Sequence, residues 1–198
     1  KTMKQSTLGS TDWALKTKVT RRAQFLSEMD TVVPWARLLA VIEPYYPKAV
    51  QGRPPHPMPR MLRIYFMQQW FNLSDPAMED ALYDSESMRR FAGIDLTTDL
   101  VPDETTILRF RHLLEKHQLT EQLFTEVRQL LEEKKLLLKS GTIVDATIIA
   151  APPSTKNAAK ERDPEMKQTR KGKQWHFGMK LHVGTDRRGL VHSVATGP

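Results

Sequence analysis

The spacing of apolar residues changes once along this chain of 198 residues, and that change constrains the fold more than any other feature. From about Val19 to Leu138, apolar side chains recur at the spacing of amphipathic helices. From Gly141 the period becomes two, in a β-branched run that ends at Ala150. The sequence therefore predicts an α+β protein in which an all-helical domain is followed by strands.

Capping and helix-breaking residues divide the first part into a succession of helices. Ser74 and Asp103 stand where helices are expected to begin, and Gly93 stands where one is expected to end. The segment from Met61 to Leu73 is apolar on nearly every side, so we expect it to be the buried centre of the helical domain.

The second part is expected to hold three strands. Residues 141–150 predict a buried strand, and residues 151–174 interrupt the pattern with prolines and charges. Alternation resumes at Trp175, and the sequence Asp186–Gly189 predicts the turn of a hairpin. Three strands with one hairpin make a poor domain unless another element covers their faces. The expected organisation is a mobile basic tail (1–19), a helical domain (20–139) and an incomplete β-domain (140–198).

Positive charge is concentrated at the two ends of the chain. The net charge is +7, and it divides into +5 for residues 1–53, −4 for residues 54–150 and +6 for residues 151–198. Concentrated lysine and arginine attract a polyanion, so nucleic acid is the leading partner class; solvated basic termini are the alternative. The chain has no cysteine, which excludes disulfides and thiolate metal sites. No apolar run is long enough to cross a membrane, so we expect a cytoplasmic protein.

Asp145 is the leading candidate for a catalytic residue. It lies within an apolar strand, where an ionised carboxylate needs compensation by a metal ion, a cation or hydrogen-bond donors. A salt-bridged structural aspartate is the alternative. Three histidines follow it (His176, His182 and His192), but no cysteine or carboxylate pair completes a zinc site, so they are interpreted as surface or sheet residues.

Basic residues near the N-terminus, on one expected helix and in the insertion are the candidates for DNA contact. Arg109, His112 and Lys116 share one helix face, which is either a DNA-backbone face or simply solvated. A flexible basic insertion beside a strand carboxylate suits a phosphodiester substrate, although most charged runs are solvated loops. The candidate residues are Lys16, Lys18, Arg21, Arg22, Arg109, Lys156, Lys160, Lys167, Arg170, Lys171 and Lys173.

Several segments together resemble the insertion-sequence-five group (InsH-like) of bacterial DDE transposases. The resemblance is carried by residues 59–83, 102–112, 144–149, 162–166 and 174–180, which occur in the order and spacing of that family. It implies a helical module that recognises the terminal inverted repeats of double-stranded DNA and helps to assemble subunits, followed by a ribonuclease H-like domain.

In that family, two aspartates and a glutamate hold two divalent metal ions, for which Mg²⁺ suits the hard carboxylate oxygens. The resemblance assigns Asp145 to the first of these three ligands. The other two would lie beyond Pro198, so we expect a truncated ribonuclease H-like domain and a chain that does not cut DNA by itself.

Three hypotheses follow from this sequence. The chain is a transposase fragment that binds insertion-sequence ends, or a non-catalytic regulator that occupies the ends or pairs with full-length transposase, or a remnant that only folds or forms homo-oligomers. Preference for one DNA end sequence, inhibition in trans and absence of any preference distinguish the three.

Overall fold

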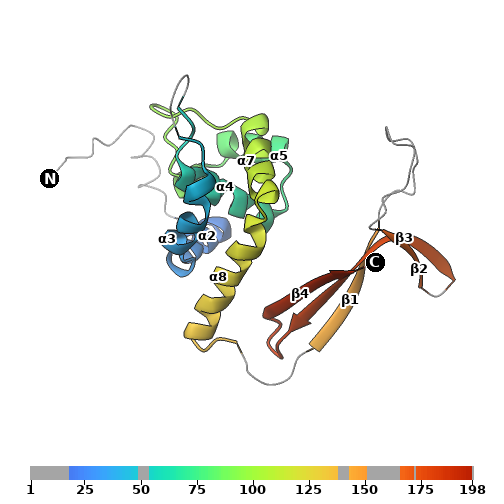
Figure 1. Cartoon of the computed structure of the whole chain (residues 1–198). Coiled ribbons are helices and arrows are strands. Elements are labelled where there is room, and N and C mark those ends of the chain that lie inside the picture. The colour runs from blue at the N-terminus through green and yellow to red at the C-terminus, as the bar shows by residue number, and fades with distance from the viewer. Residues whose placement is uncertain (1–17, 49–53, 138–142, 151–165, 172, 198) are drawn as a thin grey trace, which may run out of the picture. The chain divides into compact units, whose positions relative to one another are not determined.

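The computed structural model describes residues 18–48, 54–137, 143–150, 166–171 and 173–197, which form seven α-helices, one 3-10 helix and four strands (Figure 1). The helices are α2 (Arg21–Val32), α3 (Trp35–Ile42), the 3-10 helix η1 (Glu43–Tyr45), α4 (Met58–Phe71), α5 (Asp75–Asp84), α6 (Glu86–Ala92), α7 (Glu104–Lys116) and α8 (Leu119–Glu133). The strands are β1 (Ile143–Ala150), β2 (Lys167–Lys171), β3 (Gln174–Thr185) and β4 (Val191–Gly197). The chain divides into two compact units between Val127 and Arg128.

Helix α4 is the centre of the helical unit, as its apolar sequence predicted. It contacts α3, α5, α6 and α7 and buries Met61, Leu62, Ile64 and Met67 almost completely. Aromatic side chains from four helices pack edge-on or tilted around its C-terminal half, among them Phe25, Trp35, Phe66, Trp70 and Phe91. Because most of its surface is apolar, α4 is stable in water only when other elements cover it, and α3, α5, α6 and α7 pack around it.

Two polar side chains of α4 are also buried, and each is bonded to a neighbouring element. Arg60 donates to the Gly93 carbonyl at 2.8 Å and pairs with Asp99 at 2.9 Å. The Gln68 amide donates to one oxygen of the Asp75 carboxylate at 2.8 Å, and Arg111 of α7 donates to the other at 2.8 Å. These bonds offset the cost of removing polar groups from water, and they join α4 to α5, α7 and the loop after α6.

The predicted helix ends are confirmed at three positions. Ser74 accepts from the Ala77 amide, and Asp103 accepts from the Thr106 amide at 2.7 Å, so both are N-caps. Gly93 ends α6 with a φ of 67°, a left-handed conformation that glycine adopts without steric cost. Local side-chain chemistry therefore sets these boundaries.

The strands form one antiparallel sheet in which β3 pairs with the other three strands. Residues 178–185 of β3 pair with β1, residues 180–185 pair with β4, and residues 174–178 pair with β2. The predicted order of helices followed by strands is confirmed, and the sheet fits the ribonuclease H-like domain that the resemblance implied. Strand β2 corrects the prediction that residues 151–174 lie outside regular structure. It was missed because its sequence, Lys-Gln-Thr-Arg-Lys, contains no apolar residue whose period could indicate a strand.

Gly178 is the residue at which β3 changes partners. It pairs with Ala150 of β1 and with Lys167 of β2. A Cβ atom at this position would lie 1.9 Å from the Ile149 carbonyl oxygen, so no larger residue fits without moving the backbone.

The expected burial of β1 is wrong. Seven of its eight residues are exposed, including Ile143, Val144 and Ile149. The prediction assumed a covering layer, and within the described part of the second unit no such layer packs on this strand, so β-branched side chains remain in solvent. No described helix is long and apolar enough to cross a membrane.

Candidate functional site

Asp145 lies in the middle of β1, directly opposite Val183 of β3, which in turn pairs with Val194 of β4. Paired residues point to the same face of a sheet, so the carboxylate shares its face with these two valines. The side chain is exposed, and one of its oxygens accepts from the Ala146 amide at 2.8 Å. The carboxylate is therefore hydrated, in contrast to the buried, compensated aspartate that the sequence predicted.

Asp186 is the other described carboxylate of the sheet, and it has a structural role. It is 1% exposed, and one of its oxygens accepts from the amides of Arg188 and Leu190 at 2.9 and 3.0 Å. These bonds close the turn between β3 and β4, as the sequence predicted. Among the described residues, no three His, Cys, Asp or Glu side chains lie close enough to hold a metal ion.

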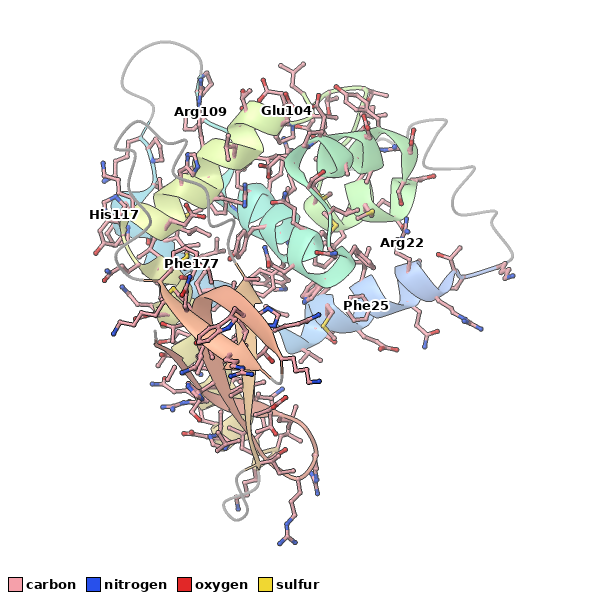
Figure 2. All side chains as sticks on the ribbon, turned by 90° about the vertical axis from the view of Figure 1, so that its right-hand side faces the viewer. Arg22, Phe25, Glu104, Arg109, His117 and Phe177 are labelled. Carbon is pink, nitrogen blue, oxygen red and sulfur yellow. The ribbon has the colours of Figure 1, made fainter. Side chains whose placement is uncertain are left out.

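The N-terminal end of α2 presents the first group of cations. Lys18, Arg21 and Arg22 are all exposed. The Arg22 guanidinium also lies over the Phe71 ring, 5.3 Å from its centroid, and donates to the Met88 sulfur at 3.9 Å, so this exposed residue packs on the helical unit through its charged group (Figure 2). Thr20 caps this helix by accepting from the Ala23 amide at 3.2 Å, which fixes where the cationic turn begins.

The outward face of α7 presents the second group. Thr105, Arg109, His112 and Lys116 are exposed, and their spacing places them along one face of the helix. Arg109 and Lys116 are about 10 Å apart along the axis, since each residue rises 1.5 Å. The exposed Glu104 lies to the side of this face and one turn before Arg109 (Figure 2). Asp103, at the start of the helix, interacts electrostatically with Arg109, and the exposed Glu115 stands next to Lys116 in the sequence. The stripe itself is therefore cationic, and carboxylates flank it at both ends.

A cavity of about 590 Å³ opens beside this stripe. Its walls include Tyr46, Pro55, His56, Phe110 and Arg109. The Tyr46 hydroxyl donates to the His56 carbonyl at 2.7 Å, and burial raises the pKa of this phenol to about 12. The hydroxyl therefore stays protonated and joins the chain after η1 to the proline-rich segment before α4.

The β2–β3 hairpin presents the third group. Lys167, Arg170 and Lys173 are exposed, and the Arg170 guanidinium lies 5.9 Å from the centroid of the Trp175 indole. Arg170 and Trp175 are cross-strand partners. The sequence showed that cations and an aromatic ring alternate here, but their pairing depends on β2, which the sequence did not indicate.

Of the four remaining candidate residues, the structure places one. Lys171 is the last residue of β2. Lys16, Lys156 and Lys160 lie outside the described residues.

Two family models match the chain. One, described as Transposase domain (DUF772), matches residues 13–113, which include most of the helical unit. The other, described as Transposase DDE domain, matches residues 137–198, which include the whole sheet. No solved structure matches the chain.

Both matches fall on the segments that carried the resemblance, so this is a protein of the transposase class. The chain belongs to the transposase family with the DUF772 domain, and the segment that contains its sheet matches a transposase DDE domain. The predicted transposase membership is confirmed.

A complete DDE transposase uses divalent metal ions. The described residues do not form such a site, because Asp145 is the only carboxylate exposed on the sheet and Asp186 is occupied by its own turn. A pair of metal ions about 3.5–4 Å apart needs several carboxylates around it.

Proposed function

We propose that this chain binds the terminal inverted repeats of a bacterial insertion sequence, as part of an insertion-sequence-five group (InsH-like) transposase. The observation that carries the proposal is the cationic stripe of α7, of which Arg109 and His112 lie within the segment matched by the transposase domain and Lys116 lies three residues beyond it. Phosphate contacts from such a stripe supply affinity and set the position of the protein on the duplex. The cations of α2 and of the β2–β3 hairpin extend the same electrostatic attraction.

Asp145 is proposed to be the first of the three metal-binding carboxylates, with Mg²⁺ as the metal. Its place in the middle of β1, within the segment matched by the DDE domain, supports this assignment. The other ligands are not among the described residues, so the 198 residues alone are proposed not to cut DNA.

A non-catalytic regulator is the second candidate. The observation that favours it is the separation of functions within the chain: the cationic stripe lies on the helical unit, whereas Asp145 lies on the sheet. A chain of this kind would occupy DNA ends, or pair with a full-length transposase, and inhibit transposition in trans. Added to a transposition reaction, it is expected to lower the yield in proportion to its occupancy of the ends.

Fluorescence anisotropy tests end binding directly. A labelled duplex from the element's end is compared with a scrambled duplex of equal composition, over a series of salt concentrations. We expect tighter binding to the true end and a steep loss of affinity with salt. Equal, weak binding to both duplexes would contradict end recognition.

A charge-matched pair of variants tests the role of α7. Arg109→Gln with Lys116→Gln removes two charges from the stripe, and the slope of log affinity against log salt should fall by about 2, since each phosphate contact contributes about 0.9. Lys48→Gln with Lys134→Gln removes two exposed charges elsewhere and should leave the slope nearly unchanged. If both double variants lower the slope equally, DNA binding depends on the net charge of the chain and not on the cations of α7.

A further inference from the structure

The first half of β3 and the whole of β2 form a two-stranded arm. Residues 174–178 of β3 pair with β2, whereas β1 and β4 pair only with residues 178–185. The hairpin therefore extends beyond the three-stranded part of the sheet (Figure 1). We call residues 167–178 the β2–β3 arm.

Trp175 is the most exposed aromatic side chain of the described residues. It is 65% exposed, whereas Trp35 and Trp70 pack against the helical core. A free indole surface of this size costs free energy in water, because tryptophan buries a large apolar area when it is covered. A side chain placed this way near the end of a hairpin is available to a partner.

The arm and the rest of β3 carry charge of one sign only. Residues 166–185 contain five lysines and arginines and no aspartate or glutamate. Arg170 lies on the same face as Trp175, and Lys173 stands in the turn one residue before β3 begins. A partner that meets this surface must offer negative charge and a flat surface for the indole together.

A single DNA strand meets both requirements. Its phosphates pair with lysine and arginine, and every base has a face that stacks on an aromatic ring. Within a duplex the base faces are covered by their neighbours, so an unpaired or frayed nucleotide fits Trp175 better than an intact helix. An acidic peptide would pair with the cations of the arm but would offer no series of planar bases for the Trp175 indole to stack on.

We propose that the β2–β3 arm binds unpaired nucleotides of DNA, with Trp175 stacked on a base and with Arg170, Lys173 and Lys167 on the flanking phosphates. This inference rests on the proposed function, because it places the unpaired nucleotides at the DNA end that the chain binds. The arm would thus contact unpaired bases, in addition to the paired DNA that the helical unit is proposed to bind.

Single-strand binding of the full chain tests the arm. The probe is labelled oligothymidine, and the variants are Trp175→Ala, Trp175→Phe and the control Val194→Ala, which truncates a half-exposed side chain of β4. We expect Trp175→Ala to weaken binding about tenfold, the effect of removing one stacking aromatic side chain. Trp175→Phe should bind within a few-fold of the native chain, and Val194→Ala should bind like it. Equal affinity of Trp175→Ala and the native chain would overturn the inference.

Tryptophan fluorescence gives a second readout. Stacking on thymine should quench part of the native emission, and this quenching should be absent in Trp175→Phe, whose remaining described tryptophans lie in the helical core. Circular dichroism of each variant establishes that the sheet has formed. Quenching of the same size in Trp175→Phe would show that the base does not lie on Trp175 and would overturn the inference.

Duplexes of two kinds separate this inference from the proposed function. One is a blunt duplex of the element's end and the other carries a short single-stranded overhang. If Trp175→Ala loses affinity for the overhang duplex alone, the arm binds unpaired nucleotides as proposed. If it weakens both duplexes equally, Trp175 acts on paired DNA and the inference fails while end binding stands. If the native chain prefers neither duplex to scrambled DNA but Trp175→Ala still loses oligothymidine binding, end recognition fails and the arm stands.

Discussion

Gly178 controls the geometry of the sheet at the scale of a single residue. Two strands meet β3 at this position, and the Ile149 carbonyl occupies the space that a side chain would need. The absence of a Cβ atom therefore lets β1 and β2 approach β3 at one point and lets the arm diverge from the rest of the sheet.

Gly178→Ala should disrupt the pairing of β1 with β3. The added methyl group would lie 1.9 Å from a backbone oxygen, and relieving such a clash costs about 1–3 kcal/mol or more. The measurement is amide hydrogen exchange of β1, which should become faster in the variant. Gly197→Ala is the matched control, because a Cβ atom there meets nothing within 4 Å. Unchanged exchange in Gly178→Ala would show that the backbone adjusts at little cost.

Asp75 organises the contacts of three helices. It accepts from Gln68 of α4 and from Arg111 of α7 while it stands in the first turn of α5. A carboxylate at a helix N-terminus is also favoured by the helix dipole. Asp75 therefore adds a polar link to the apolar packing of Ile107, Phe110 and Leu114, which also holds α7 and its cationic stripe in place.

Asp75→Ala should cost about 1–3 kcal/mol of unfolding free energy, because it leaves the buried Gln68 amide and the Arg111 guanidinium without their acceptor. Urea unfolding measures the loss. Glu86→Ala is the control, since it removes an exposed pair with Arg90 that contributes about 0.3–0.5 kcal/mol. Equal losses in the two variants would show that the Asp75 contacts are no stronger than a surface ion pair.

Helix α7 begins at a carboxylate whose pKa is held below its ordinary value. The Thr106 hydroxyl and amide stabilise the ionised form of Asp103 by hydrogen bonding. Because the pKa is lowered on folding, this stabilisation is complete above the ordinary aspartate pKa of about 4 and is lost as the pH falls below it. The N-cap of α7 is therefore sensitive to acid.

Asp103→Asn should make stability less dependent on pH between about pH 4 and pH 2, because the amide caps the helix without titrating. Urea unfolding at pH 7 and at pH 3 gives the comparison. At pH 7 the two proteins should differ little, and at pH 3 the variant should have lost less of its stability. Asp80→Asn, on the exposed side of α5, serves as the control. An identical acid response in the variant and the native chain would contradict the role of Asp103.

For the whole molecule, the sequence predicted the helical unit better than the sheet. Helix boundaries depend on local signals such as Asp103 and Gly93, and the core depends on α4, whose sequence is apolar on nearly every side. The exposure of β1 depends instead on what covers it, which no local pattern records. Strand β2 is held by its pairing with β3 rather than by an apolar face, so its sequence resembles a loop.

The candidate site followed the same rule. Asp145 became a candidate because a charge within an apolar strand is conspicuous, and Arg109 and Lys116 became candidates by their helical spacing. The Arg170–Trp175 pair was not found, because cross-strand neighbours are distant in the chain and their register is set by the whole hairpin.

The two units should differ in their protection from hydrogen exchange. The helical unit has a continuous core that includes Leu38, Ile64 and Leu114, whereas the described strands bury only Gly178, Gly184 and, at the turn, Asp186. We expect slow exchange in α4 and α7 and much faster exchange in β1 and β4. Mass spectrometry of exchanged peptides measures both. Comparable protection would mean that another layer covers the sheet in solution.

The position of Asp145, with no other described carboxylate beside it, leads to a prediction about activity. Incubated with its DNA end and Mg²⁺, the 198-residue chain should release no cleaved strand, because Asp145 has no described carboxylate beside it. Denaturing electrophoresis detects cleavage at the end. Mg²⁺-dependent cleavage that Asp145→Asn abolishes would show that the chain assembles a complete site.

The charge of Asp145 also affects the solubility of the chain. Strand β1 is an eight-residue run of mostly β-branched side chains, exposed on both faces, with no proline or glycine and with Asp145 as its single charge. Such runs associate edge to edge, and one charge within them acts as a gatekeeper against aggregation. Asp145→Ala would therefore remove a proposed metal ligand and a protective repulsion together. Asp145→Glu keeps the charge, so the two variants together separate loss of chemistry from loss of soluble protein.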